Sequence, residues 1–275
     1  MKKTIIYLIC TVFLTNTGRG NIMISKQESD SFIYSPAAAT YRTNQTDTLL
    51  INIQAHVQNA FVNGKISNSD KDLAGLEKEL LSMNRNNNNS IITYWYSYAC
   101  YYHSILFLMQ KENKRAEKIL DEGIIQLNKI PNPNSEHLAL LSLMESLSIQ
   151  YASGMEIPGI SKQARQNAEK ALQLDSLNLR AYYVLGSNDF YSPAQYGGGK
   201  KAAGYLLKAI RLKEQSVANP ILPSWGKNSA YEMLIRVYIK QKLYDEAKKY
   251  YKEASALYPY DYMIIKLSEE LKILK

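Results

Sequence analysis

The chain has 275 residues, of which 46% are hydrophobic and 21% charged, and 33 basic against 25 acidic side chains give a formal net charge of +8. The basic surplus is spread along the sequence and forms no block. Binding of nucleic acid through a basic patch needs a clustered stripe, so we expect no nucleic-acid partner. The composition indicates a solvated surface with weak attraction for anionic partners.

The N-terminus has the organisation of a secretory signal. Two lysines precede an apolar run over 4–14, which is too short to cross a bilayer, and Gly20 is a small residue of the kind that signal peptidase selects. We therefore expect a signal peptide over 1–20. A flexible leader is expected over 21–44, which is rich in Ser, Thr, Asn and Ala and lacks a helical period. A lipoprotein signal is the alternative, but Ile9 stands where a small residue should precede the first cysteine.

Removal of this signal leaves 30 basic and 25 acidic side chains, a net charge of +5, and Cys100 as the remaining cysteine. An exported chain without an intrachain disulfide is typical of a bacterial periplasm, so we expect a periplasmic or envelope-associated protein. No later stretch approaches the ~20 apolar residues of a membrane-spanning helix. We therefore expect no transmembrane segment after signal removal.

The residues that follow the leader predict a first helical hairpin. From Thr48 to Asn63 apolar residues recur at helical spacing, and Gly64 is expected to end that helix. Ser69 and Asp72 have the spacing of a capping box for a second helix with a leucine stripe. The run 84–90, nearly all Asn, predicts a turn. We expect this hairpin to be a divergent cap.

Beyond residue 90 one pattern of small and large residues occurs four times. Its members are Ala116, Leu120, Gly123 and Asn128; Ala164, Ala168, Ala171 and Ser176; Ala202, Leu206, Ala209 and Glu214; and Ala247, Tyr251, Ala254 and Pro259. Residues four and seven apart share one helix face, so the small side chains let a partner helix approach closely. Partner helices are expected over 91–110, 136–151, 179–190 and 227–240. The pattern therefore predicts successive antiparallel hairpins.

A closing helix is expected over 261–274. Its apolar stripe is Met263, Ile264, Leu267, Leu271 and Leu274, and its other face is charged, as a terminal cap that meets water requires. Residues 45–275 are thus predicted to form an all-α domain, an α-solenoid of about five antiparallel hairpins with a C-terminal capping helix. An irregular helical bundle is the alternative, because the alanine patterns lie 48, 38 and 45 residues apart rather than ~34.

The spacing of the last unit resembles the tetratricopeptide repeat (TPR) family. The matching residues are Tyr231, Leu234, Tyr238, Ala247, Tyr251, Ala254 and Pro259, and Leu185 with Gly186 matches the family's Leu-Gly pair one unit earlier. In the last unit Ile235 replaces the family's glycine. The segments 192–200 and 223–227 are similar to an exported bacterial subgroup that includes partner proteins of periplasmic TRAP-type transporters.

This resemblance implies a right-handed superhelix with a concave groove lined by the first helix of each hairpin. The groove positions would be Tyr98, Tyr101 and Ile105; Glu145 and Ile149; Arg180, Tyr183, Ser187 and Tyr191; and Glu232, Arg236 and Lys240. Tyrosine offers large area and a hydroxyl at low entropic cost, so we expect a binding role for Tyr98, Tyr101 or Tyr183, with core packing as the alternative. The three cations of this set, opposite its two acids, would select the partner's charge.

Residues that carry chemistry in other proteins have structural explanations here. The turn Gly197–Lys201 precedes a helix whose amides suit an anion, but it lacks the first glycine and the hydroxyl of a Walker loop, so a flexible turn is favoured. His56, His103 and His137 lie on separate predicted hairpins without a second ligand at metal spacing. Cys100 falls at the bulky position of its repeat, so we expect a buried and inert thiol. We therefore expect no cofactor, no metal site and no catalysis.

The sequence thus predicts an exported, non-enzymatic interaction scaffold. Its groove is expected to bind a protein partner through an extended peptide, a chain terminus or a helix. The alternative is a periplasmic small-ligand-binding accessory of a transport system, with an anionic or hydrophobic metabolite held between hairpins.

Overall fold

The computed structural model describes residues 49–85, 89–214 and 219–273. Every regular element in these ranges is helical, which confirms the all-α class. The α-helices are α3 (Ile53–Ser67), α4 (Lys71–Asn84), α5 (Ser90–Met109), α6 (Asn113–Asn128), α7 (Ser135–Ser148), α8 (Ile157–Leu174), α9 (Leu179–Tyr191), α10 (Ala202–Arg211), α11 (Lys227–Lys240), α12 (Tyr244–Leu257) and α13 (Tyr262–Ile273), with a 3₁₀ turn, Ala194–Tyr196, before α10. The expected signal peptide, 1–20, and leader, 21–44, lie outside the described residues.

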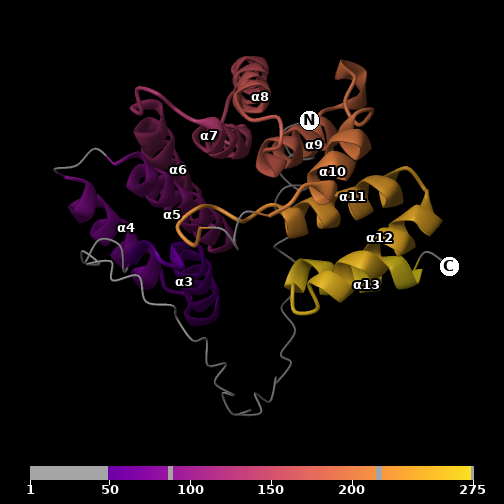
Figure 1. The fold of residues 1–275 in the computed structure, drawn as a ribbon, viewed down its shortest axis with the longest axis horizontal. Helices are drawn as coiled ribbons and strands as arrows, with labels where there is room; N and C mark the ends of the chain where they lie inside the picture. The colour runs from indigo at the N-terminus through magenta and orange to yellow at the C-terminus, as the bar shows by residue number, and fades with distance from the viewer. Residues whose placement is uncertain (1–48, 86–88, 215–218, 274–275) are drawn as a thin grey trace, which may run out of the picture.

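The helices of the described chain pair into five consecutive hairpins. The pairs are α3–α4, α5–α6, α7–α8, α9–α10 and α11–α12, and α13 packs on the last. Figure 1 shows them side by side in an arc, with α5, α7, α9 and α11 on the inner side and α6, α8, α10 and α12 on the outer side. Contacts of α7 with α5 and α9, and of α9 with α11, join the inner helices. The predicted α-solenoid with a C-terminal capping helix is confirmed, and the irregular bundle is not.

The small residues of the repeated pattern set how closely the paired helices approach. Every alanine of the pattern is at most 1% exposed. At Gly123 an added Cβ would lie 2.6 Å from Cε of Met144 and 2.9 Å from Cβ of Cys100, so the neighbouring helices fill the space that a side chain would need. In the last unit Tyr250, rather than Tyr251, is the buried ring, because it stacks on a tyrosine of α11 at 5.6 Å.

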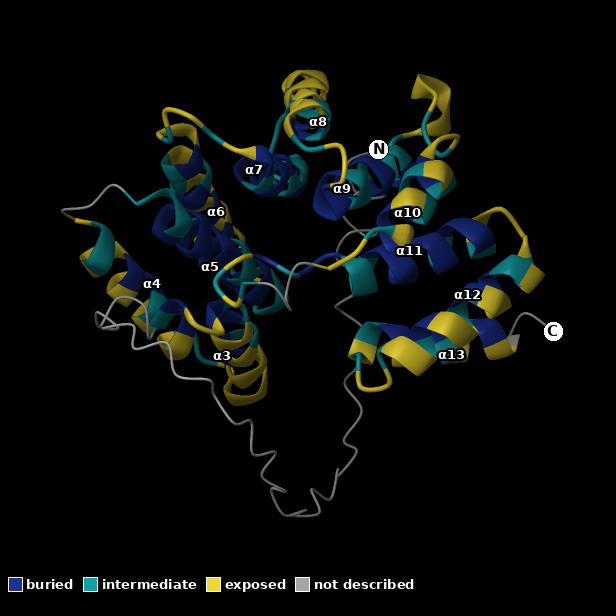
Figure 2. Cartoon of the chain, viewed as in Figure 1, coloured by how far each residue is buried: buried dark blue, intermediate teal, exposed yellow. Residues whose placement is uncertain are grey.

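Helix α5 is the centre of the N-terminal half. Fourteen of its 20 residues are buried, which a helix achieves only when it is packed on most sides. It contacts α3, α4, α6 and α7, and Figure 2 shows it mainly in the colour of buried residues. Its aromatic residues divide between core and surface: Tyr94, Trp95 and Tyr98 are fully buried in the core, whereas Tyr101 and Tyr102 are only partly buried.

The first hairpin differs from the prediction at the end of its first helix. Helix α3 continues through Gly64 to Ser67 and ends at Asn68, whose backbone is left-handed with φ of 52°. A Cβ at Gly64 would lie 2.7 Å from Cδ2 of Leu106 on α5. The glycine therefore permits a close approach between helices and does not end the helix, because Asn68 supplies the left-handed residue that the turn needs.

The predicted capping box of the second helix does not form. Helix α4 begins after Asp70, whose side chain makes no capping bond, and Oγ of Ser69 accepts from the N–H of Lys71 at 3.4 Å rather than from that of Asp72. The carboxylate of Asp70 accepts a 2.6 Å hydrogen bond from Arg115 of α6, and that of Asp72 accepts a 3.2 Å hydrogen bond from Asn63 of α3. Both carboxylates thus join neighbouring helices, which removes them from capping.

The ends of the arc approach each other. Helix α13 turns Ile264, Leu267 and Leu271 into the core and leaves Glu269 exposed, as predicted for a cap. At its start the ring of Tyr262 lies 4.7 Å from Nζ of Lys65, on α3 at the other end of the arc. Among the described residues, no helix combines the length and the apolar character needed to cross a bilayer.

Candidate functional site

An irregular segment crosses the inner side of the arc. Helices α10 and α11 are joined by residues 212–226, and the described part of this link, 219–226, is called the connector here. Figure 1 shows it passing from α11 across the centre of the arc toward α5 and α3. Nε1 of Trp95 on α5 donates to the carbonyl of Ile221 at 2.9 Å, and the N–H of Ser224 donates to Oε1 of Gln54 on α3 at 2.9 Å. The inner helices therefore hold the connector by its main chain.

One side chain anchors the connector. Trp225 is 7% exposed and lies among Tyr94, Tyr98, Arg180 and Tyr183, a group called the tryptophan site here. Its Nε1–H donates to the hydroxyl of Tyr94 at 2.6 Å. Its ring is stacked near that of Tyr98, with centroids 6.0 Å apart, meets the edge of Tyr183 at 6.3 Å, and has the guanidinium of Arg180 5.9 Å from its centroid. The site thus satisfies the polar edge of the indole and covers its apolar faces.

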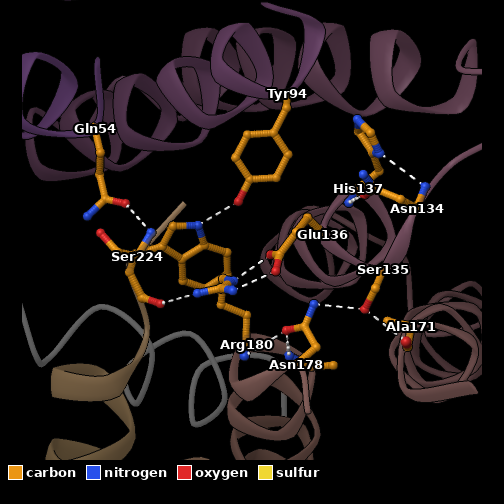
Figure 3. Close-up of polar contacts among 12 residues, drawn as sticks. Gln54, Tyr94, Asn134, Ser135, Glu136, His137, Ala171, Asn178, Arg180 and Ser224 are labelled. Carbon is orange, nitrogen blue, oxygen red and sulfur yellow. Dashed lines mark hydrogen bonds and ion pairs between the residues drawn. The ribbon is translucent and has the colours of Figure 1, made fainter. Parts of the chain in front are cut away.

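The guanidinium of Arg180 is held rigidly at the start of α9. Its Nε and Nη2 donate to the two oxygens of Glu136 on α7, both at 2.5 Å, and its Nη1 donates to the carbonyl of Trp225 at 3.3 Å (Figure 3). Burial opposes its charge, but the hydrogen bonds and charge of Glu136 outweigh burial and raise the pKa of Arg180 above its usual value. A bidentate pair of this kind fixes the guanidinium plane beside the connector.

The helix start that carries Arg180 is fixed by a second set of bonds. The side chain of Asn178 accepts from the N–H groups of Arg180 at 2.9 Å and Ala181 at 3.1 Å, which is an N-cap. Its amide group donates to Oγ of Ser135 at 2.8 Å, and that hydroxyl donates to the carbonyl of Ala171 at 2.8 Å (Figure 3). Helices α7, α8 and α9 are thereby locked together behind the tryptophan site.

Three helices, α5, α9 and α11, carry a further part of the predicted groove. Tyr101 on α5 and Tyr183 and Tyr191 on α9, called the tyrosine group here, each have a pKa raised above its usual value by burial, with Tyr183 the next cause for Tyr101 and Glu232 the next cause for the α9 pair. Ser187, also on α9, is 8% exposed. Nζ of Lys240 donates to the carbonyl of Phe190 at 3.1 Å. Binding of a partner by these residues stays a prediction.

The predicted groove cations and acids do not simply face each other across the groove, because two of the arginines form ion pairs within the chain. Nε of Arg236 donates to Glu232 one turn away at 2.5 Å, and its Nη1 donates to Glu270 of α13 at 2.9 Å. Arg180 pairs with Glu136, which the sequence reasoning did not select. Because both guanidiniums already have carboxylate partners within the chain, charge selection by them requires these pairs to open.

Glu145 lies between the helices of the third hairpin. Its two carboxylate oxygens accept hydrogen bonds from Gln163 and Asn167 of α8, each at 2.8 Å, and the residue is 4% exposed. Burial, opposed by these hydrogen bonds, raises the pKa of Glu145 to about 7. This carboxyl group faces α8, which accounts for its neighbours better than the groove position assigned from sequence.

The turn Gly197–Lys201 is closed by a carboxylate of the chain. The N–H groups of Lys201 and Ala202, at the start of α10, both donate to Oδ2 of Asp189 at 2.8 Å. Gly197 and Gly199 have φ of 82° and 81°, a backbone region that favours glycine. Asp189 therefore occupies the amides that an anion would need, and the structural explanation of this turn is favoured.

His103, His137 and the thiol have surroundings suited to structural roles, and His56 is exposed. His137 exchanges 3.1 Å hydrogen bonds with Asn134 to form a capping box at the start of α7, and His103 lies 2.8 Å from Glu77. Burial raises the pKa of Cys100 well above its usual value, which disfavours a reactive thiolate. Within 49–85, 89–214 and 219–273, no group of three or more His, Cys, Asp or Glu residues could hold a metal ion.

Sequence reasoning missed the connector as an element of the inner side. Trp225 had a usable signal, because a tryptophan between Pro223 and Gly226 in a segment without helical period suggests an anchor. Gln54 and Glu136 had no usable signal in the sequence, because each contacts a residue that is distant along the chain and becomes a neighbour only in the folded structure. Their contacts with Ser224 and Arg180 span 170 and 44 residues.

Comparison with known proteins identifies the class of fold. No family model matches the chain, and no curated protein matches it. Among solved structures it is similar to a thermophilic TPR protein of Thermus thermophilus, with a TM-score of 0.53 and 15% sequence identity over 80% of this chain and 99% of that chain. At this identity the likeness shows the fold alone. The fold of the described chain is TPR-like.

Proposed function

We propose that the protein is an exported, non-enzymatic scaffold that binds a peptide or helix of a protein partner on the inner side of its solenoid. One observation carries this proposal: the inner helices already hold a peptide segment, the connector. They accept from Ser224 N–H, donate to the carbonyls of Ile221 and Trp225, and enclose one large side chain. These are the contacts by which a groove binds an extended peptide, with main-chain bonds giving affinity and a side-chain pocket giving selectivity.

A photo-crosslinking pair on one hairpin tests the location of binding. A photoreactive amino acid replaces Tyr101 on the inner helix α5 in one variant and the exposed Lys118 on the outer helix α6 in the other. In cells that express the full chain, the Tyr101 variant should give a discrete adduct with one protein, and the Lys118 variant should not. Equal adducts from both positions, or an adduct from Lys118 alone, would place binding elsewhere and refute the proposal.

Export is the second part of the proposal. It is supported by the two lysines and apolar run at the N-terminus, and by a chain that keeps Cys100 as its one cysteine after cleavage. The resemblance to exported partner proteins of TRAP-type transporters is consistent with a periplasmic or envelope-associated location. Fractionation of cells that express the full chain, beside a variant without residues 2–20, tests it. Recovery of both forms in the same compartment at full length would refute export.

A small-ligand-binding accessory of a transport system remains a second candidate because of the tyrosine group. Its members, Tyr101, Tyr183 and Tyr191, come from two inner helices and are partly buried. Hydroxyls on a largely apolar wall suit a small anionic or hydrophobic metabolite. A thermal-shift screen of metabolites separates the candidates, since stabilisation that is lost on replacing Tyr183 with Phe favours the accessory, and no shift favours the scaffold.

A further inference from the structure

We propose that the connector is an internal stand-in for the partner, and that the partner segment is an extended peptide with the pattern Pro-x-Trp-Gly that takes the connector's place in the tryptophan site. This inference rests on the proposed scaffold function and specifies its ligand. It follows from how the connector is bound, how the site is supported, and how the connector is joined to the helices.

The connector is recognised through few features of its sequence. Ile221 and Ser224 contribute main-chain groups to the bonds with Trp95 and Gln54, so other residues at these positions can make the same bonds. The side chain of Leu222 is exposed, whereas Pro223 and Trp225 are buried. The side chain of Ile221 is partly buried against the core cluster that contains Trp225, so side-chain recognition rests on the proline and the tryptophan, with a smaller contribution from Ile221.

The residue after the tryptophan must be small. Gly226 has φ of 107°, and a Cβ added there would lie 3.2 Å from Cγ of Arg180 and 3.3 Å from Cδ1 of Leu179. A left-handed backbone and a wall formed by α9 together favour glycine at this position. This constraint adds the last residue to the Pro-x-Trp-Gly pattern.

The tryptophan site is supported by residues outside the connector. Arg180 is held by Glu136, and the ring of Tyr94 meets the edge of Trp95 at 5.1 Å. The hydroxyl of Tyr98 accepts from Gln58 at 3.3 Å and donates to the hydroxyl of Tyr102 at 3.4 Å. Because none of these contacts involves Trp225, we expect the site to stay preorganised for another indole, and its buried hydroxyl acceptor on Tyr94 favours an occupant with an N–H.

The connector belongs to a long link between helices. The link 212–226 has fifteen residues, whereas α8 and α9 are joined by four, 175–178, and α12 and α13 by four, 258–261. Loops that exceed the usual two to eight residues of helix–helix connections are commonly functional. Trp225 and Gly226 directly precede α11, and Gly226 is the N-cap of that helix, so release of the tryptophan also rearranges the start of α11.

Arg180 does not select an acidic occupant, because Glu136 already neutralises its charge. An acidic segment would bring a third charge to this buried pair. The contacts therefore favour a neutral aromatic segment over an acidic one.

Binding in trans tests the proposal directly. The probe is a labelled peptide with the sequence of residues 219–226, Asn-Pro-Ile-Leu-Pro-Ser-Trp-Gly, and the control peptide has Ala in place of its tryptophan. The proteins are the full chain and its Trp225→Ala variant, compared by fluorescence anisotropy. We expect the variant to bind the probe at least ~10-fold more tightly than the unmodified chain, in which the tethered connector competes at high effective concentration. The control peptide should bind the variant at least ~10-fold more weakly than the probe.

Two further measurements keep the outcome decisive. Circular dichroism tests whether Trp225→Ala is folded. If that variant is unfolded, Trp225→Phe takes its place, because it retains an aromatic ring and loses the bond to Tyr94. The expected order of affinities is the same for both variants. Equal binding of probe and control peptide by a folded variant, or no binding, overturns the proposal. A concentration-dependent dimer of the variant that persists with excess probe also overturns it, because the occupant would then be a second copy.

The scaffold proposal and this inference fail differently. A partner adduct at Tyr101 that the probe peptide abolishes and the control peptide does not supports both. An adduct that resists the probe leaves the scaffold intact and overturns the assignment of the partner segment. Loss of the inner-side adduct itself overturns the scaffold, whatever the peptide does.

Discussion

Replacement of Glu145 by Gln should stabilise the fold above pH 7 and leave it nearly unchanged near pH 4. The carboxyl is buried against α8, where its pKa rises from 4.5 to about 7. The folded state therefore binds a proton more tightly than the unfolded state, and the stability that this proton gives is fully present below pH 4.5 and is lost as the pH rises through 7. Glutamine has the shape of the protonated acid and keeps it at every pH.

The size of this effect follows from the change in pKa. Each pKa unit corresponds to about 1.4 kcal/mol, so the interval from 4.5 to about 7 corresponds to about 3 kcal/mol of destabilisation when Glu145 is ionised in the folded state. Relaxation of the amides of Gln163 and Asn167 reduces this, so we expect a gain of about 2 kcal/mol for Glu145→Gln at pH 8.5. Urea unfolding followed by circular dichroism at pH 4 and pH 8.5 measures it.

A second variant tests whether the gain in stability comes from the burial of Glu145 or from the removal of any negative charge. Glu232 is also buried with a raised pKa, but its partner is Arg236, so Glu232→Gln leaves that guanidinium with Glu270 alone. We expect this variant to lose about 1–2 kcal/mol at pH 8.5 rather than to gain. If Glu145→Gln is no more stable than the unmodified chain at pH 8.5, the reasoning from burial is refuted.

Two pairs of substitutions probe the packing and the ion pair. Gly123→Ala should destabilise by about 2 kcal/mol because its Cβ would lie 2.9 Å from that of Cys100, whereas Gly75→Ala in α4, with no atom within 4 Å of its Cβ, should be neutral or stabilising by up to about 1 kcal/mol, as measured by urea unfolding. Arg180→Met should cost about 3–5 kcal/mol because it removes the bidentate guanidinium that pairs with Glu136 of α7. Adding Glu136→Leu to Arg180→Met should recover part of that loss in the same assay, and a double variant as unstable as the single one would contradict the pairing.

The features recovered from sequence are those that depend on local spacing. Ala202 and Ala209 share one face of a helix whatever the rest of the chain does, and their neighbours lie on the adjacent helix, so periodicity suffices to place them in the core. The same argument located the hairpins and the capping helix. It failed at Gly64, where a glycine typical of a helix end serves a close contact with Leu106.

The candidate site was only partly accessible from sequence. The resemblance to the TPR family implied a shared groove for Tyr98, Arg180 and Tyr183, and all three meet at the tryptophan site. The occupant of that site could not be predicted, because an irregular segment has no period from which its path follows. The partner of Glu145 could not be predicted either, since the spacing of one helix does not show how its neighbour is rotated about its axis.

The connector also bears on the elasticity of the molecule. Repeat solenoids bend and stretch like springs because each unit touches only the next. Here Gln54 and Ser224, 170 positions apart, form a bond across the curve, and Trp95 adds another to Ile221. These contacts between distant parts of the arc should stiffen the solenoid and should be the first to resist extension when its two ends are pulled apart. The force at which they break should therefore be the force at which the solenoid begins to open.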